Sequence, residues 1–139
     1  MKSPILSIIV PCFNSAGFIN RTIDMLICQD LSGCELILVN DGSTDNTLDI
    51  LKCYELNQDI RIIDQKNLGV SAARNAGMIM AKGKFVYFLD SDDSLTDNSL
   101  SFFRQIIQEH SDCQLIAFGY FTRKNECLGK RFIYPKLDK

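Results

Sequence analysis

The chain has 139 residues, of which 46% are hydrophobic and 23% are charged, and this composition is ordinary for a soluble globular protein. The formal net charge of -2, with no block of Lys and Arg beyond two pairs near the C-terminus, argues against binding of nucleic acid. No apolar run approaches the roughly 20 residues of a membrane span, and the N-terminal run is stopped early by Pro11. We therefore expect one domain over residues 1–139, in the cytoplasm or at the inner face of the membrane.

The six cysteines form no C-x-x-C pair, and the single histidine, His110, is far in sequence from most of them. This pattern argues against a zinc site. Several cysteines lie in or beside apolar runs, where a reduced cysteine behaves as a small hydrophobic residue. The sequence therefore predicts a reducing compartment.

Apolar strands alternate with amphipathic helices along the chain, without a linker, a repeat or a low-complexity tract. We expect strands over residues 6–10, 35–40, 60–63, 84–89 and 114–121, and helices that carry Ile19 to Ile27, Leu48 and Leu51, Val70 to Ala81, and Asn98 or Ser99 to His110. The last helix is expected to bury Phe102, Phe103, Ile106 and Ile107. Such an alternation implies right-handed crossovers. The predicted fold class is α/β, with three α/β/α layers around a mainly parallel sheet and with residues 120–139 as a hairpin or a partly disordered tail.

Three carboxylates, those of Asp90, Asp92 and Asp93, directly follow the fourth apolar run. They repel one another, and no basic residue lies among them, so we expect either a bound cation or a solvent-exposed loop. In open parallel sheets, ligands bind outside the carboxyl ends of the strands. Polar or unusual residues follow each of the first four predicted strands, namely Pro11 and Asn14, then Asp41, then Lys66 and Gly69, then Asp90 to Asp93. The sequence therefore predicts a ligand site at this one edge of the sheet.

Four motifs occur in order along the chain, at residues 7–14, 38–45, 67–77 and 88–93, with the sequences SIIVPCFN, LVNDGSTD, NLGVSAARNAG and FLDSDD. Together they resemble the ordered motifs of glycosyltransferase family 2, over about residues 6–100. The resemblance implies the nucleotide-sugar half of a GT-A fold, an inverting transferase and a divalent metal ion, Mn²⁺ or Mg²⁺. It also implies a nucleotide-sugar donor, with a UDP-sugar favoured, and a glycan or lipid-linked acceptor.

The resemblance assigns roles to the residues of the acidic motif. Asp92 would ligate the metal ion, Asp90 would contact the ribose or the metal ion, and Asp93 would support both. Ser91 would belong to the nucleotide-sugar-binding set. Hard cations such as Mg²⁺ take oxygen ligands and often use one or two carboxylates together with substrate phosphates.

The resemblance also assigns the other side of the site. Asp41 matches the family position that recognises the base or the ribose, and Pro11 and Asn14 would lie beside that base. Arg74, just inside a predicted helix, would place a cation near the diphosphate, and its alternative role is a surface ion pair. Lys66 would contact the donor directly, or else it is an exposed loop lysine.

The general base of the transfer is not identified. Full-length relatives carry a further segment that binds the acceptor and supplies this base. Acidic residues do follow the metal motif, but none lies in a recognisable motif; they are Glu109, Asp112, Glu126 and Asp138. We expect a truncated transferase for polysaccharide or cell-surface glycan synthesis. The alternative is a catalytically incomplete fragment that binds nucleotide sugar and metal, or an assembly module.

Two other classes of protein share part of the acidic pattern. A phosphatase of the haloacid dehalogenase type also places D-x-D after a strand, but its nucleophile strand comes first in the chain. A calcium loop is suggested by Asp90, Asp92 and Ser94, but Leu95 occupies the position of the turn glycine. An uncovered sheet edge would invite self-association, and peripheral association with a membrane stays open.

Overall fold

The computed structural model describes residues 3–117 and 132–134. The chain divides into two compact units, Met1–Phe102 and Phe103–Lys139. The expectation of one domain over residues 1–139 stays a prediction. Within the described residues, no helix has both the length and the apolar character needed to cross a membrane.

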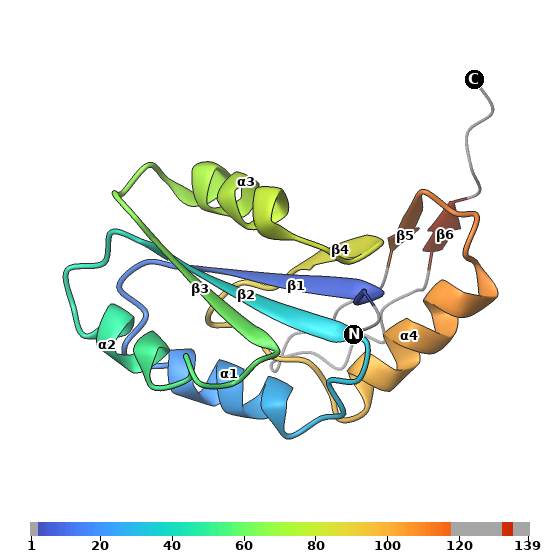
Figure 1. Cartoon of the computed structure of the whole chain (residues 1–139), viewed down its shortest axis with the longest axis horizontal. Coiled ribbons are helices and arrows are strands. Elements are labelled where there is room, and N and C mark those ends of the chain that lie inside the picture. The colour runs from blue at the N-terminus through green and yellow to red at the C-terminus, as the bar shows by residue number, and fades with distance from the viewer. Residues whose placement is uncertain (1–2, 118–131, 135–139) are drawn as a thin grey trace, which may run out of the picture. The chain divides into compact units, whose positions relative to one another are not determined.

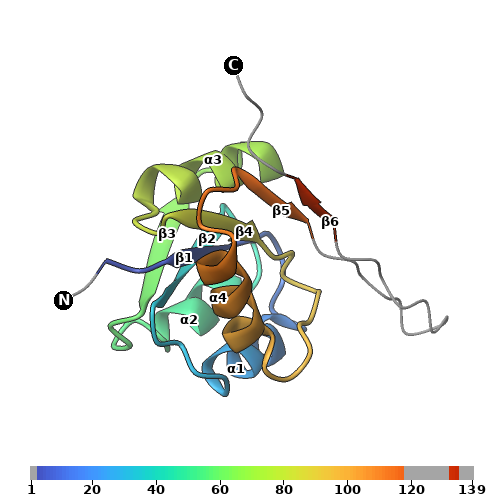
Figure 2. The ribbon, with the colours of Figure 1, turned by 90° about the vertical axis from the view of Figure 1, so that its right-hand side faces the viewer.

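The first unit is built around a parallel sheet with the strand order β3-β2-β1-β4 (Figure 1). Its strands are β1 (Leu6–Cys12), β2 (Cys34–Asp41), β3 (Ile60–Gln65) and β4 (Phe85–Phe88). Helices α1 (Ile19–Ile27) and α2 (Thr47–Lys52) lie on one face, and α3 (Val70–Met80) covers the other, as Figure 2 shows from the side. The three-layer α/β class predicted from the sequence is confirmed.

The central strands are buried because helices cover both of their faces. Every residue of β1 and β2 is buried, and Leu36 to Val39 have no exposed surface. Strands in this position are apolar throughout instead of alternating with polar residues. On the α3 side, Ile9, Ile37 and Val39 pack against Ala73 of the helix. The uninterrupted apolar runs of the sequence therefore predict the centre of the sheet well.

Pro11 lies inside β1 and is buried, so the expectation that the first strand stops before it is wrong. The carbonyl group of Ile9 accepts a hydrogen bond from the N–H of Leu89, so the odd-numbered residues here face the chain that leaves β4. Pro11 is the next odd-numbered residue and has no N–H to donate. Pairing with β2 continues to the end of β1, whereas pairing with β4 ends at Ile9. Pro11 thus lies where β4 separates from β1.

Several other predicted boundaries differ from the structure by a few residues. The second and third strands extend to Asp41 and Gln65, and the fourth strand and the helix before it are shorter than expected. Helix α4 (Ser99–Glu109) begins at one of the two expected positions. Phe102, expected to be buried on this helix, is 42% exposed. Strand and helix ends depend on local pairing that hydrophobic periodicity does not report.

The predicted fifth strand does not join the parallel sheet. Within the described residues it covers Leu115–Ala117 as β5, which pairs antiparallel with β6 (Phe132–Tyr134). The hairpin or partly disordered tail expected over residues 120–139 stays a prediction. The rest of the tail, residues 118–131 and 135–139, lies outside the described residues.

The strand order reverses at the edge of the sheet where the sequence predicts a ligand site. The chain moves from β1 outward to β2 and β3, and then crosses back through α3 to β4 on the other side of β1. The order therefore reverses between β1 and β4. In open α/β sheets, ligands bind outside the carboxyl ends of the strands at such a point. The acidic motif follows β4 at that position.

Candidate functional site

The acidic motif forms a turn directly after β4. The N–H of Asp93 donates to the carbonyl oxygen of Asp90 at 3.0 Å, which closes the turn, and Asp90, Asp92 and Asp93 are all exposed. Partial burial, and then the negative charges of Asp92 and Asp90, raise the pKa of Asp93. The mutual repulsion expected from the sequence is therefore present in the folded chain.

Arg74 of α3 reaches this acidic turn. Its Nη2 atom lies 2.7 Å from Oδ1 of Asp90, and its guanidinium carbon lies 5.7 Å from the centroid of the Phe88 ring. The side chains of Arg74 and Asp90 are 36% and 51% exposed, so the pair lies at the surface of the sheet edge. The structure brings together a cation and a carboxylate that the sequence assigned separately to the site. Phe88, which the sequence analysis did not assign to the site, supports the guanidinium from below.

Asp41 fixes the loop before α3. Its Oδ1 atom accepts hydrogen bonds from Gln65 Nε2 at 2.7 Å and from the N–H of Leu68 at 2.9 Å, and its Oδ2 atom accepts the N–H of Gly69 at 2.8 Å. Burial would raise the pKa of Asp41, but these hydrogen bonds outweigh it and the pKa is lowered. Lys66 is exposed in the same loop. Asp41 therefore holds the start of α3 and keeps its negative charge there.

Asn14 joins the loops that follow β1 and β2. Its backbone has a φ of 49°, in the left-handed region where asparagine is tolerated. Its N–H donates to Ser43 Oγ at 3.0 Å, and its Oδ1 accepts the N–H of Thr44 at 2.8 Å. Pro11, assigned to the same wall of the site, is buried within β1. These contacts shape the loop, and direct contact of either residue with a base stays a prediction.

A chain of hydroxyl groups that sequence reasoning missed ties the acidic turn to its neighbours. Ser15 Oγ lies 2.9 Å from Ser91 Oγ, and Thr22 Oγ1 donates to the carbonyl oxygen of Ser91 at 2.7 Å. The N–H of Ser15 donates to Thr47 Oγ1 at 2.7 Å, and Thr47 Oγ1 donates in turn to Asp45 Oδ1. Ser15, Thr22 and Thr47 are buried. The one signal in the sequence is that Thr22 and Thr47 occupy positions on the apolar faces of α1 and α2.

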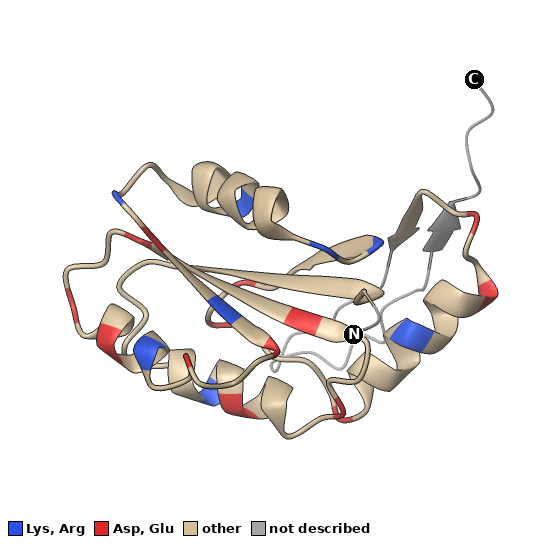
Figure 3. Cartoon of the chain, in the orientation of Figure 1, with Lys and Arg blue, Asp and Glu red and all other residues tan. Residues whose placement is uncertain are grey.

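The charges of both signs at this edge are visible in Figure 3, where acidic and basic segments lie at the end of the sheet at which α3 begins. Within the described residues, no three His, Cys, Asp or Glu side chains are grouped so that they could hold a metal ion by themselves. Exposed carboxylates in a turn still suit a hard divalent cation, provided that substrate oxygens complete its shell. The carboxylate oxygens of the acidic turn therefore fit Mn²⁺ or Mg²⁺, provided that a phosphate group of a ligand shares the ion.

None of the described cysteines forms a disulfide. Burial raises the pKa of the Cys12 thiol to about 12, so this thiol stays protonated and behaves as a core residue. Cys127 lies outside the described residues. The reducing compartment expected from the cysteine pattern stays a prediction.

The family model for glycosyl transferase family 2 matches residues 7–131. This chain belongs to glycosyl transferase family 2. Among curated proteins, the uncharacterized glycosyltransferase EpsJ of Bacillus subtilis (strain 168) is 38% identical over 136 residues, which are 97% of this chain and 39% of EpsJ. The resemblance predicted from the four motifs is confirmed.

Solved structures of glycosyltransferases share the fold. The crystal structure of S. aureus TarS 1–349 in complex with UDP-GlcNAc matches with a TM-score of 0.71 and 34% identity, over 76% of this chain and 32% of that chain. The mannosyltransferase PcManGT from Pyrobaculum calidifontis, in complex with GDP-Man and Mn²⁺, matches with a TM-score of 0.65 and 25% identity, over 73% and 31%. The predicted GT-A fold is confirmed, and the chain spans less than half of the length of EpsJ and of these two solved chains.

Proposed function

We propose that the edge of the sheet at β1 and β4 binds the nucleotide diphosphate of a sugar donor, and that the sugar is transferred with inversion to a hydroxyl group of a glycan or lipid-linked acceptor. The observation that carries this proposal is the Arg74–Asp90 pair, because it joins a permanent cation to an acidic cluster at the point where the strand order reverses. TarS in complex with UDP-GlcNAc and with UDP supports a UDP-sugar as donor.

The diphosphate would lie between Arg74 and the start of α3. Arg74 keeps its charge at every physiological pH and can present two N–H groups to phosphate oxygens. Gly69, with a φ of 89°, precedes the helix, so the first N–H groups of α3 and its positive dipole end lie at this edge. Lys66 of the same loop adds a second cation to this side of the donor.

The base and the ribose would lie on the side of Asp41 and Asn14. Asp41 is buried and accepts three hydrogen bonds, and a carboxylate has about four acceptor positions, so one would remain for a ring N–H or a hydroxyl group that reaches it. Its lowered pKa keeps this carboxylate an acceptor at neutral pH. Asn14 shapes the loop beside it through Ser43 and Thr44.

A divalent cation, Mn²⁺ or Mg²⁺, would be held by Asp92, with Asp90 and Asp93 beside it. When bound, such a cation takes up negative charge on the leaving diphosphate as a Lewis acid. Asp92 and Asp90 would supply the carboxylate ligands, and Ser91 would fix the turn through its contact with Ser15. PcManGT in complex with GDP-Man and Mn²⁺ supports this choice of cation.

The alternative proposal is that this chain binds the donor without completing the transfer. The general base is not assigned; Glu109 and Asp112 lie in the second unit, and Glu126 and Asp138 lie outside the described residues. A role in polysaccharide or cell-surface glycan synthesis, a cytoplasmic location, association with a membrane surface and self-association are all part of the proposal.

Calorimetric titration of UDP and of GDP, each with and without Mn²⁺, tests the donor site. We expect UDP to bind only with Mn²⁺, and Asp92→Asn to weaken this binding at least about tenfold, because a metal ligand is lost. Asp97→Asn, at an exposed position in the same loop, is the matched control and should bind as the wild type does. Metal-independent binding, or no binding of either nucleotide, would contradict the proposed site. Release of free sugar or of glycosylated acceptor from the donor then separates transfer from binding alone.

A further inference from the structure

Both ends of α3 are tied to the same strand, β2, by buried carboxylates. At the start of the helix, Asp41, the last residue of β2, accepts the N–H groups of Leu68 and Gly69. At the other end, Glu35, the second residue of β2, accepts the N–H of Lys82 at 2.6 Å. The first of these contacts belongs to the candidate site, and the second lies at the opposite edge of the sheet. The helix is thus held at two points on one rigid element.

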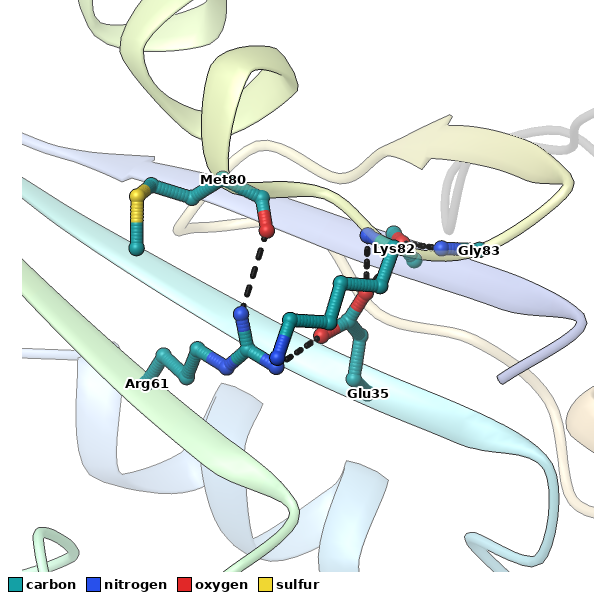
Figure 4. Close-up of polar contacts among 6 residues, drawn as sticks. Glu35, Arg61, Met80, Lys82 and Gly83 are labelled. Atoms are coloured by element: carbon teal, nitrogen blue, oxygen red, sulfur yellow. Dashed lines mark hydrogen bonds and ion pairs between the residues drawn. The ribbon is translucent and has the colours of Figure 1, made fainter. Parts of the chain in front are cut away.

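Glu35 is the centre of a compact polar group, shown in Figure 4. Its Oε1 atom also accepts a hydrogen bond from Ser7 Oγ at 2.6 Å, and its Oε2 atom lies 3.1 Å from Arg61 Nη2. Arg61 Nη1 donates at 3.1 Å to the carbonyl oxygen of Met80, the last residue of α3. Glu35 is only 5% exposed, and a buried charge is tolerated only with partners of this kind. Oε1 is therefore hydrogen-bonded, Oε2 has the ion pair with Arg61 but no hydrogen bond within the described residues, and the group holds the end of the helix.

The distance between the two carboxylates along β2 is close to the length of α3, and charged groups at both helix ends agree with the helix dipole. From Glu35 to Asp41 the strand spans about 20 Å, and the eleven residues of α3 span about 17 Å. A carboxylate at the start of a helix and a guanidinium at its end both agree with the helix dipole. Asp41 and Arg61 occupy these two places.

The face of α3 that packs on the sheet is smooth. The buried residues of the helix are Ala73 and Gly77, and a Cβ atom at Gly77 would lie 2.4 Å from Cγ2 of Ile9. Helices normally fix their position by inserting large side chains into the grooves of a partner. Ile9 packs closely against Gly77, but no large side chain is among the buried residues of α3, so packing alone resists a shift along the helix axis only weakly. Its place on the sheet therefore depends on the polar ties at its two ends.

We propose that Glu35 is a positioning residue, which holds the end of α3 and thereby sets Arg74 in place for the donor diphosphate. Arg74 lies in the second turn of α3, and its Nη2 reaches Asp90 at 2.7 Å. A shift of the helix along its axis by a fraction of one turn removes this reach. The inference rests on the proposed role of Arg74 in donor binding and extends it to a residue at the far edge of the sheet.

A double-mutant cycle on the full chain tests this coupling. Binding of UDP with Mn²⁺ is measured by calorimetry for Glu35→Gln in the wild-type background and in the Arg74→Ala background. We expect Glu35→Gln to weaken binding about tenfold in the first background and less than about twofold in the second. An equal loss in both backgrounds would show that Glu35 acts only on general stability, and it would overturn the proposal. Glu55→Gln, an exposed position after α2, is the matched control.

A second readout does not need the ligand. Arg74 Nε is buried, and no hydrogen-bond partner for it is found within the described residues, so its N–H reports on how closely the side chain is held. We expect Glu35→Gln to speed hydrogen exchange of this N–H, followed by NMR, at least about fivefold, and Glu55→Gln to leave it unchanged. Unchanged exchange in Glu35→Gln would overturn the proposal. If UDP does not bind the wild type, the proposed donor site is wrong, and the exchange measurement alone then tests whether Glu35 holds Arg74 in place.

Folding of the variant is the remaining control. Circular dichroism and thermal unfolding show whether Glu35→Gln keeps the native fold. If it does not, Arg61→Gln replaces it, because the Arg61 side chain is 29% exposed and its loss frees the carbonyl group of Met80. The same cycle with Arg74→Ala and the same exchange measurement then apply, with the same expected and contrary results.

Discussion

Nη2 of Arg74 lies 2.7 Å from Oδ1 of Asp90, although the two residues are 16 positions apart in the chain. The helix and the strand end that carry them meet only because α3 crosses the sheet between β3 and β4. A cation that neutralises one carboxylate of an acidic cluster can also receive a phosphate group, since guanidinium groups bind both in the same forked geometry. The pair is therefore a natural place for a diphosphate bound together with a metal ion.

Replacing Arg74 tests this directly. We expect Arg74→Ala to weaken binding of UDP with Mn²⁺ by about 10- to 100-fold, because a charge-assisted hydrogen bond is lost. The free energy of unfolding should change by less than about 1 kcal/mol, since partly exposed ion pairs contribute little to stability. Arg74→Lys should recover only part of the affinity. Arg21→Ala, at an exposed position of α1, serves as the control, and equal effects of both alanine variants on UDP binding would refute the assignment.

Asp41 gives the fold a dependence on pH. Burial favours its neutral form, but hydrogen bonds from Leu68, Gln65 and Gly69 lower its pKa below the ordinary value of 3.8. Because the pKa is lower in the folded chain than in the unfolded one, ionised Asp41 stabilises the fold above about pH 4. This contribution is lost as the pH falls through the pKa of the folded state.

The prediction for Asp41 is measured by urea unfolding at a series of pH values. Asp41→Asn should lower the free energy of unfolding at pH 7 by about 1–3 kcal/mol, since an amide group cannot accept both sets of N–H groups. Below about pH 4 the wild type should lose stability more steeply than Asp41→Asn. The exposed Asp59→Asn should follow the wild type. Parallel curves for wild type and Asp41→Asn would show that the hydrogen bonds do not favour the charged form.

The sequence predicts the parallel sheet and the edge that carries the site because uninterrupted apolar runs mark strands buried on both faces. Two of these runs end at Asp41 and just before Asp90, and Arg74 lies in the helix that follows the third run. Ligands bind outside the carboxyl ends of parallel strands, so the three residues are expected at one edge of the sheet. Sequence patterns do not predict Pro11 within β1. Proline stops most strands, and here the missing N–H falls where β4 has already separated, a fact of pairing and not of composition.

Buried polar residues form the other part that could not be predicted. Thr22 lies on the apolar face of α1, and Glu35 is the second residue of β2, so hydrophobic pattern places both positions in buried elements but does not name the polar partners that their side chains need there. Their partners are Ser91 and Arg61, which are distant in sequence. Only the tertiary fold brings such pairs together. The residues proposed to bind the donor could be assigned by motif, whereas the buried polar residues that hold their loops and helices in place could not.

The hydroxyl group of Thr22 holds the acidic turn, and this role can be tested without changing its volume. Thr22→Val removes the hydrogen bond to the carbonyl oxygen of Ser91, which is 2.7 Å long. We expect a loss of about 1–2 kcal/mol in the free energy of unfolding, because a partly buried acceptor is left unpaired, and weaker binding of UDP with Mn²⁺. Thr22→Ser keeps the hydroxyl group and should retain the binding. Full binding by Thr22→Val would show that the turn holds its shape alone.

Gly77 allows α3 to lie close to the sheet, so a larger residue at this position should push the helix away from the sheet. In Gly77→Ala the new Cβ atom would lie 2.4 Å from Cγ2 of Ile9, which is buried and cannot move aside freely. Alanine favours a helix by about 1 kcal/mol over glycine, and crowding of a packed core costs about 1–3 kcal/mol. We therefore expect a net loss of up to about 2 kcal/mol in the free energy of unfolding, together with weaker donor binding as Arg74 moves outward with the helix. Gly17→Ala, where no atom lies within 4 Å of the added Cβ, should leave both quantities unchanged. A stabilised Gly77→Ala would show that the sheet yields at Ile9 more easily than the close packing suggests.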